Sequence, residues 1–215
     1  MLQKEKLLKP RNKKRIKHSR YFVILLIIYF LLTKTQSLLI EDNFIPEKFN
    51  DTLAALLVCF GAIGRFYSML FIGGKKDRKI VTDGPFSVVR NPLYVCSFVA
   101  LLGFLLALGR IDILVIVMVA FFFYYGDTVA REEKNLEKEF GKEYLDYKAK
   151  TPKYIPDFKL WHTPEFIQVN TKVILKYFVF LVCFLIAIPM VEGLEGLKQM
   201  YPNFGLLDLD KLLGL

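Results

Sequence analysis

The chain has 215 residues, of which 54% are apolar and 24% charged, and its formal net charge is +9. The apolar residues form runs that are too long for a small soluble core, so the sequence predicts a membrane protein that crosses the bilayer several times. The positive charge lies beside these runs, which favours contact with membrane lipids and argues against binding to nucleic acid.

The chain begins with a basic segment, because residues 1–20 hold nine Lys or Arg residues and one Glu. We expect this segment to be a cytoplasmic leader that is attracted to anionic lipids. An apolar run follows at residues 21–32, and the polar residues 33–37 after it offer no small-residue cleavage pattern. The run therefore predicts an uncleaved membrane anchor rather than a signal peptide that is removed.

Five apolar runs come close to the roughly 20 residues that a helix needs to cross the hydrocarbon core. They are residues 21–40, 52–72, 93–109, 113–129 and 173–191. The third and fourth runs are short and share a tight turn at residues 109–112, which predicts a helical hairpin. We therefore expect an all-α fold, a polytopic membrane helix bundle with about five transmembrane helices.

The charges between the runs predict the orientation of the chain in the membrane. The segments with an excess of Lys and Arg carry a summed charge of +12, and they are residues 1–20, 73–92 and 130–172. The other two segments sum to −5, and they are residues 41–51 and 192–215. Because Lys and Arg mark cytoplasmic loops, we expect a multi-pass protein with its N-terminus in the cytoplasm and its C-terminus outside.

The second run contains small residues and one cation. Gly61 and Gly64 would let a neighbouring helix approach closely. Arg65 lies towards the cytoplasmic half of the run, where it either extends to the membrane surface or points at an anionic group between helices. Asp127 in the fourth run is either the partner of Arg65 or a surface residue.

A rigid polar elbow, GPFSVVRNPLY at residues 84–94, precedes the third run. Pro92 suits the first turn of a helix, and Asn91 suits the N-cap before it. One interpretation is a well-formed helix start with Arg90 extending to the membrane surface. The other is an anion site, in which Arg90 grips a carboxylate and Tyr94 faces the helix interior one turn further on.

A second polar segment follows the fourth run. Its residues Leu136, Phe140, Tyr144 and Tyr147 recur at helical spacing, and charged residues cover the other face. This pattern predicts an amphipathic cytoplasmic helix over residues 131–150, which ends at Thr151-Pro152. Its position lets it face the elbow from the same side of the membrane.

Together the two polar segments, separated by a hairpin, resemble the isoprenylcysteine carboxyl methyltransferase and phospholipid methyltransferase superfamily, whose members are integral membrane enzymes. The matching residues of the first block are Gly84, Pro85, Phe86, Arg90, Pro92 and Tyr94. Those of the second block are Glu132, Glu133, Leu136, Phe140, Gly141, Tyr144, Tyr147 and Pro156. The resemblance covers about residues 55–158.

The resemblance implies methyl transfer from S-adenosylmethionine to a membrane-embedded lipophilic acceptor that enters from the bilayer. The acceptor is either a carboxylate of the isoprenylcysteine kind or a phospholipid amine. A carboxylate is nucleophilic at neutral pH, whereas an amine must first lose a proton, for which a glutamate with a raised pKa would be the natural base. The sequence leaves this choice and the oligomeric state open.

The same resemblance implies a set of site residues. We expect catalytic roles for Arg90, Tyr94 and Glu132. We expect cofactor contacts from Arg90, Asn91, Pro92, Tyr94, Arg131, Glu132 and Glu133. Arg90 or Arg131 would hold the cofactor's carboxylate, the two glutamates its ammonium or ribose hydroxyls, and Tyr94 or Tyr144 its sulfonium or adenine. No metal is expected, because the three cysteines lie apart from one another.

Three positions depart from the family pattern: Asn91 replaces the usual histidine, Thr128 a frequent arginine, and Lys153 an arginine. The departures at Asn91 and Thr128 keep one alternative open, a catalytically inactive relative that binds lipid or a partner protein. A second alternative is an NADPH-dependent membrane reductase, since sterol reductases share a distantly similar core. By domain, the sequence predicts a leader (1–20), a methyltransferase core (21–160), and a last part (161–215) with the fifth span and an outer tail.

Overall fold

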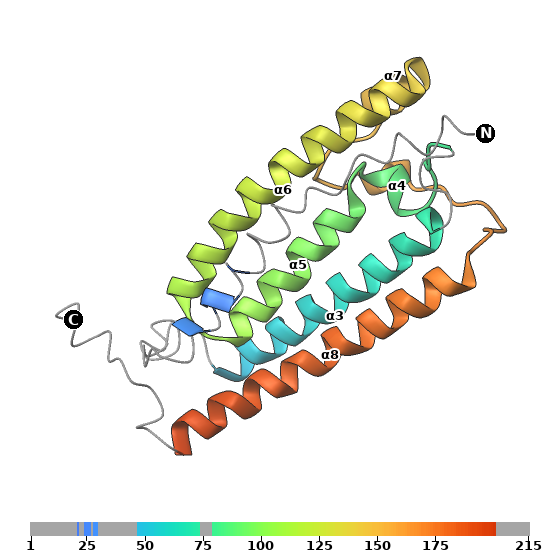
Figure 1. Cartoon of the computed structure of the whole chain (residues 1–215). Coiled ribbons are helices and arrows are strands. Elements are labelled where there is room, and N and C mark those ends of the chain that lie inside the picture. Colours follow the sequence, from blue (N-terminus) through green and yellow to red (C-terminus); the bar gives the residue numbers. More distant parts are fainter. Residues whose placement is uncertain (1–20, 22–23, 27, 30–46, 74–78, 201–215) are drawn as a thin grey trace. The chain divides into compact units, whose positions relative to one another are not determined.

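The computed structural model describes residues 47–73 and 79–200, together with residues 21, 24–26, 28 and 29 (Figure 1). Within these residues every regular element is a helix, which confirms the predicted all-α class. The chain divides into two compact units, Met1–Gln36 with Leu197–Leu215, and Ser37–Gly196. The leader, most of the first predicted span and residues 201–215 lie outside the described residues, and the features below belong to the second unit.

Two described helices are long and apolar enough to cross a membrane. They lie within α3 (Glu47–Ile72) and α6 (Ile111–Phe140). Two further apolar stretches are shorter, namely α5 (Pro92–Ala107) and residues Ile174–Cys183 of α8 (Thr171–Met200). The structure therefore bears out membrane-capable helices in the predicted second and fourth runs, while the count of five spans stays a prediction.

The surface of α6 has the character expected of a helix in contact with lipid. Its side chains Val115, Phe122 and Phe123 are exposed by 53%, 63% and 79%. Apolar side chains of this size and number would be unfavourable in water, whereas hydrocarbon accepts them. This surface and the length of the helix together indicate that the chain associates with a membrane.

Helices α3 and α5 pack side by side at very short range (Figure 1). A Cβ atom placed on Gly61 would lie 2.4 Å from the backbone nitrogen of Ala100. One placed on Gly103 would lie 2.6 Å from the carbonyl oxygen of Ala54. Because only glycine fits at these two crossings, the prediction that small residues of the second run allow close helix approach is confirmed.

The predicted turn between the third and fourth runs is also confirmed. Helix α5 ends at Ala107 and α6 begins at Ile111, with Gly109 at a φ of +62° between them. Arg110 binds Asp112 through two contacts, Nε to Oδ1 at 3.0 Å and Nη2 to Oδ2 at 2.6 Å. The turn is therefore fixed by backbone and side chains alike.

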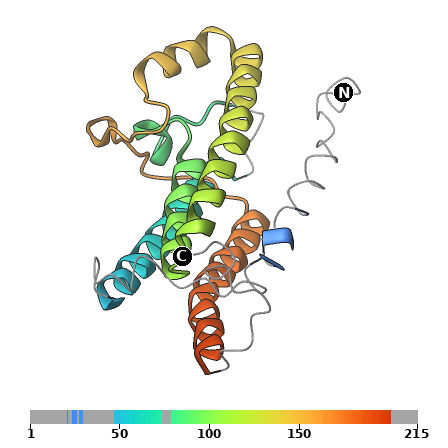
Figure 2. The ribbon, with the colours of Figure 1, turned by 90° about the vertical axis from the view of Figure 1, so that its left-hand side faces the viewer.

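One predicted boundary is wrong. Residues 131–140 do not begin a separate cytoplasmic helix, because α6 continues without a break through the end of the fourth run to Phe140. The stretch after Gly126 contains no glycine or proline until Gly141, whose φ of +55° ends the helix. A shorter helix, α7 (Lys142–Lys150), then turns away from the line of α6 (Figure 2).

Two small elements complete the description. The elbow contains a single helical turn, α4 (Pro85–Val88), and the chain after α7 contains a 3₁₀ turn, η2 (Phe158–Leu160). The two turns lie against each other. They bring the elbow and the segment after α7 together at one end of α3, α5 and α6.

Candidate functional site

The elbow begins the site by fixing the backbone at the start of α5. Gly84 has a φ of +60°, and a Cβ atom there would lie 2.4 Å from the ring of Phe71. Pro92 occupies the first turn of α5, as predicted, and Asn91 occupies the N-cap position. The side chain of Asn91 makes no capping bond, however, and its amide nitrogen instead donates to Glu133 and to the carbonyl oxygen of Lys153.

Arg90 is turned into the protein. Its Nε donates to Glu133 Oε1 at 3.1 Å, and its Nη1 donates to the carbonyl oxygens of Lys148 and Thr151 at 2.8 and 2.7 Å. The Arg90 and Glu133 side chains are exposed by only 10% and 9%. This geometry excludes the interpretation in which Arg90 extends to the membrane surface. The guanidinium instead joins the elbow to α6 and to the end of α7, where a cation also complements the helix dipole.

Glu133 is the centre of a buried polar cluster. Its Oε1 also accepts a bond from Asn91 Nδ2 at 3.1 Å, and its Oε2 lies 3.8 Å from Lys153 Nζ. Asn91 Nδ2 donates in addition to the carbonyl oxygen of Lys153 at 3.3 Å. The buried carboxylate is therefore surrounded by donors, as a charge in a low-dielectric setting requires.

A second pair lies beside this cluster. Tyr94, one turn into α5, donates from its hydroxyl to Glu132 Oε2 at 2.8 Å. Glu132 is half-buried, so its carboxylate still has access to solvent or a ligand. The Tyr94 ring meets the ring of Tyr125 edge to face, with centroids 5.2 Å apart. Adjacent glutamates thus serve two different partners, because neighbouring positions on a helix point about 100° apart.

The structure places Arg131 away from the cluster and decides between the alternatives that the sequence left open for Arg65 and Asp127. Arg131 lies on an exposed face of α6, where its Nη2 pairs with Asp127 Oδ2 at 2.7 Å. Asp127 is therefore not the partner of Arg65, and Arg131 does not face Glu133 and Tyr94. Arg65 instead donates to the carbonyl oxygen of Leu93 at 2.9 Å and to Ser97 Oγ.

Two tyrosines of α7 pack near the Glu133 cluster and the elbow. Tyr144 is fully buried, and its burial together with the nearby Glu133 carboxylate raises the pKa of its phenol to about 12. Tyr147 donates to the carbonyl oxygen of Phe86 at 2.7 Å. Burial likewise raises the pKa of Tyr147. Both phenols therefore stay neutral at physiological pH and act within the packing of α7 against the elbow.

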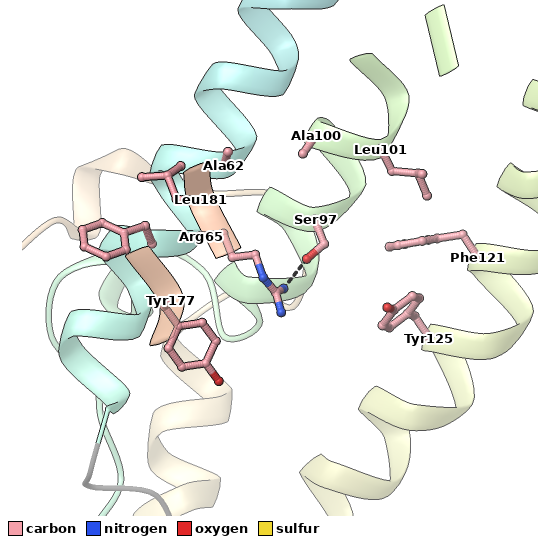
Figure 3. Close-up of a pocket in the computed structure, with 10 residues that line it drawn as sticks. Ala62, Arg65, Ser97, Ala100, Leu101, Phe121, Tyr125, Tyr177 and Leu181 are labelled. Atoms are coloured by element: carbon pink, nitrogen blue, oxygen red, sulfur yellow. Dashed lines mark hydrogen bonds between the residues drawn. The ribbon is translucent and has the colours of Figure 1, made fainter. Parts of the chain in front are cut away.

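A cavity of about 230 Å³ lies between α3, α5, α6 and α8 (Figure 3). Its lining residues are Ala62, Arg65, Phe66, Ser97, Ala100, Leu101, Phe121, Tyr125, Tyr177 and Leu181. The walls are mainly apolar, and the Arg65 guanidinium reaches into it beside Ser97. Tyr125 belongs both to this wall and to the ring pair with Tyr94, so the cavity adjoins the Tyr94–Glu132 pair.

Sequence reasoning missed three residues of this cavity: Ser97, Tyr125 and Tyr177. A usable signal existed, because each is a hydroxyl side chain inside an otherwise apolar run. A wider recess of about 620 Å³ lies next to Glu133 and is lined by charged side chains of α6 and by Lys148 and Lys153. No group of three or more potential metal-ligating side chains occurs within the described part of the chain.

Comparison with known proteins finds a family model and several relatives that resemble part of the chain. Residues 54–143 match the family model described as phospholipid methyltransferase. The nickel-cobalt-cadmium resistance protein NccN of Alcaligenes xylosoxydans xylosoxydans is 33% identical over 119 residues, or 55% of each chain. The cobalt-zinc-cadmium resistance protein CzcN of Cupriavidus metallidurans is 32% identical over 110 residues, or 51% of this chain and 50% of the relative.

A third relative carries an enzyme's name. Protein-S-isoprenylcysteine O-methyltransferase of Schizosaccharomyces pombe is 33% identical over 124 residues, or 53% of this chain and 52% of the relative. The chain thus spans about half the length of the curated relatives it matches, and no solved structure matches it. Residues 54–143, which hold the elbow and both glutamates, are therefore similar to the phospholipid methyltransferase family, and the isoprenylcysteine methyltransferase relative supports the superfamily resemblance that the sequence motifs indicated.

Proposed function

We propose that this protein transfers a methyl group from S-adenosylmethionine to a lipophilic acceptor that reaches the site from the bilayer. The observation that carries the proposal is the meeting of the two family blocks beside an apolar cavity, to which the Tyr94–Tyr125 ring contact connects them. Tyr94 binds Glu132 there, and Arg90 and Asn91 bind Glu133. The matched family is a methyltransferase family, which favours methyl transfer over the NADPH-dependent reductase.

The donor set of the site suits S-adenosylmethionine. Half-buried Glu132 can accept bonds from an ammonium or from ribose hydroxyls, and Lys153, whose side chain is 37% exposed, offers a cation to a carboxylate. The rings of Tyr94 and Tyr125 offer aromatic surface to a sulfonium or an adenine. Arg90 has its Nε and Nη1 donors engaged within the protein, so we assign it the task of holding Glu133 in place. When bound, the cofactor supplies a methyl group activated by its sulfonium.

The residues of the chain then contribute mainly orientation. Two hydrogen-bonded pairs hold the two carboxylates in fixed directions, and the apolar cavity wall keeps water away from the acceptor. Alignment of this kind can supply on the order of 7–11 kcal/mol of rate acceleration without a dedicated catalytic triad. For an amine acceptor, Glu132 would serve as the base, because it is the more accessible carboxylate and lies next to Tyr94.

We propose that the acceptor's reacting end occupies the cavity beside Arg65. Arg65, Ser97 and Tyr125 line it among apolar side chains, and this combination suits a polar head joined to a hydrocarbon chain. A carboxylate head would pair with the Arg65 guanidinium, whereas an ammonium head would be repelled by it. Both acceptors named above remain subjects of the test.

The alternative is a catalytically inactive relative that binds lipid or a partner protein. One observation favours it: Arg90 and Asn91 already have partners within the protein. The Glu133 cluster could therefore act as a structural latch, which means that it only holds the elbow against α6 and α7. In that case the cavity would still bind a lipophile, but no methyl group would move.

Transfer of a radiolabelled methyl group distinguishes an active methyltransferase from the inactive alternative. The purified chain in lipid nanodiscs is incubated with labelled S-adenosylmethionine and either a farnesylated cysteine or phosphatidylethanolamine, and the label extracted into the lipid phase is counted. We expect transfer to one acceptor, at least about tenfold weaker in Glu132→Gln and unchanged in Glu139→Gln, whose site on α6 is exposed. Transfer to neither, by a protein that binds lipid in the cavity, would contradict methyl transfer to these acceptors and favour the inactive alternative.

A further inference from the structure

The segment after α7 presents an unusual number of large apolar side chains on its surface. Within residues 154–166, five such side chains are exposed by 42% to 84%, and they are Tyr154, Ile155, Phe158, Trp161 and Phe166. Contiguous exposed apolar surface on a protein marks a partner or a membrane. We call residues 154–166 the apolar segment.

The backbone of the apolar segment is held firmly against the elbow. The Asp157 amide donates to the carbonyl oxygen of Val88 at 3.0 Å, and the Gly84 amide donates to that of His162 at 2.8 Å. The His162 amide in turn donates to Ser87 Oγ at 3.3 Å. These bonds fix both ends of the stretch that contains the η2 turn. The apolar side chains are therefore displayed by an ordered backbone that the elbow supports.

The position of Trp161 relates the apolar segment to a membrane-capable helix. Its ring stacks on that of Tyr67 in α3, with centroids 6.3 Å apart and planes 12° apart. Tyr67 precedes the end of α3 at Ile72 by five residues, which is about 7.5 Å of helix. Trp and Tyr gather at the boundary between hydrocarbon and water. The stacked pair thus has the position and composition of a membrane-interface contact.

We propose that the apolar segment inserts its large side chains into the headgroup region of the same bilayer that surrounds α3. The bilayer is the partner that fits this surface, because Trp161 of the apolar segment stacks on Tyr67 of α3, a helix long and apolar enough to cross a membrane. Within it one lysine, Lys159, stands against the acids Asp157 and Glu165. Insertion is therefore driven by apolar area rather than by attraction to anionic lipids, and it should depend little on salt.

Insertion of the apolar segment would also position the elbow of the candidate site. The Arg90 amide donates to the carbonyl oxygen of Pro152 at 2.8 Å, just before the apolar segment begins. Through this bond and the three bonds to Gly84, Ser87 and Val88, insertion fixes the depth of the elbow at the membrane surface. The inference does not depend on methyl transfer, since it rests only on the surface and on the position of the segment.

The test uses the fact that Trp161 is the single tryptophan of the chain. The full chain is placed in nanodiscs of phosphatidylcholine brominated at carbons 6 and 7 or at carbons 11 and 12, and its fluorescence is compared with that in unbrominated lipid. We expect a loss of at least about half of the fluorescence with the shallow bromines, a smaller loss with the deep ones, and little quenching by aqueous iodide. The same result is expected with and without anionic lipid.

Single tryptophans introduced elsewhere in the apolar segment distinguish insertion of the whole segment from contact of Trp161 alone with lipid beside α3. In a Trp161→Phe background, Phe166→Trp and Ile155→Trp are expected to be quenched by the shallow bromines as well. The matched control in that background is Glu143→Trp on the exposed face of α7, which iodide should quench and bromolipid should not. Iodide quenching at 155 and 166 without bromolipid quenching would show a segment in water and overturn the proposal. Protection from both quenchers would show a protein cover and overturn it too.

Discussion

At the scale of single residues, the site depends on the donors that hold one buried carboxylate, Glu133. Glu133 receives donors from Arg90 and Asn91 and lies near Lys153. Removing one partner of such a buried pair leaves an uncompensated charge, which costs more than the pair itself contributes. Loss of Arg90 should therefore destabilise the fold strongly.

Replacing Arg90 tests this dependence. Arg90→Ala removes the bond to Glu133 and two bonds to carbonyl oxygens, so we expect the free energy of unfolding to fall by about 3–5 kcal/mol. The exposed pair of Arg131 and Asp127 supplies the control, since Arg131→Ala should change it by less than about 1 kcal/mol. Denaturant unfolding in detergent measures both. Equal effects of the two substitutions would contradict the assignment of Arg90 as a buried clamp.

Replacing Tyr94 tests the second pair. Tyr94→Phe keeps the ring but removes the bond to Glu132, so we expect methyl transfer to fall about five- to tenfold while the free energy of unfolding changes by about 1 kcal/mol or less. Tyr124→Phe, at an exposed tyrosine of α6, is the control and should retain full transfer. Wild-type transfer by Tyr94→Phe would remove Tyr94 from the site.

At the scale of elements, the site depends on the close crossing of α3 and α5. This contact places Arg65 of α3 beside Leu93 and Ser97 of α5, and so forms one wall of the cavity. Where the signal was local, the sequence predicted it well: Pro92 starts α5, Gly109 makes the turn, and small residues mark the crossing. The boundary of the cytoplasmic helix was wrong, because an apolar-to-polar change in composition does not interrupt a helix that lacks a breaking residue.

Adding one methyl group to the crossing should disturb it. Gly61→Ala brings a Cβ atom to 2.4 Å from the Ala100 nitrogen, a contact that only separation of the helices can relieve. We expect a loss of about 1–3 kcal/mol in the free energy of unfolding. In contrast, Gly126→Ala meets nothing within 4 Å and should be neutral or stabilising. Thermal unfolding of both variants in detergent measures this, and equal stability of the two would refute a close crossing.

At the scale of the whole molecule, the site joins segments that are distant in sequence. Arg90 and Glu133 are 43 positions apart, and no spacing rule links them. The resemblance identified Glu132 and Glu133 together but could not assign one to Tyr94 and the other to Arg90. That division, like the cavity beside Arg65 and the pairing of Asp127 with Arg131, arises only from how the helices pack.

The contacts between the elbow and the segments around α7 also restrict how the chain can cross the membrane. The elbow and the segment after α6 bind each other directly, so both must lie on one side of the membrane. In a cysteine-free background, we expect Lys79→Cys and Glu143→Cys to react with a membrane-impermeant maleimide from the cytoplasmic side alone, as the loop charges predict. A tag after Leu215 should be reached from outside. Reaction of the two cysteines from opposite sides would contradict the fold itself.

The central proposal is that the Tyr94–Glu132 pair and the adjoining Glu133 cluster, at the start of α5 and the end of α6, bind S-adenosylmethionine. Calorimetric titration of the purified chain with S-adenosylmethionine or S-adenosylhomocysteine in detergent tests it most directly. We predict a dissociation constant in the micromolar range, raised at least about tenfold by Glu132→Gln and unchanged by Glu139→Gln. Absence of binding at millimolar ligand, by a chain that still unfolds cooperatively, would contradict the account and leave the cluster as a structural latch.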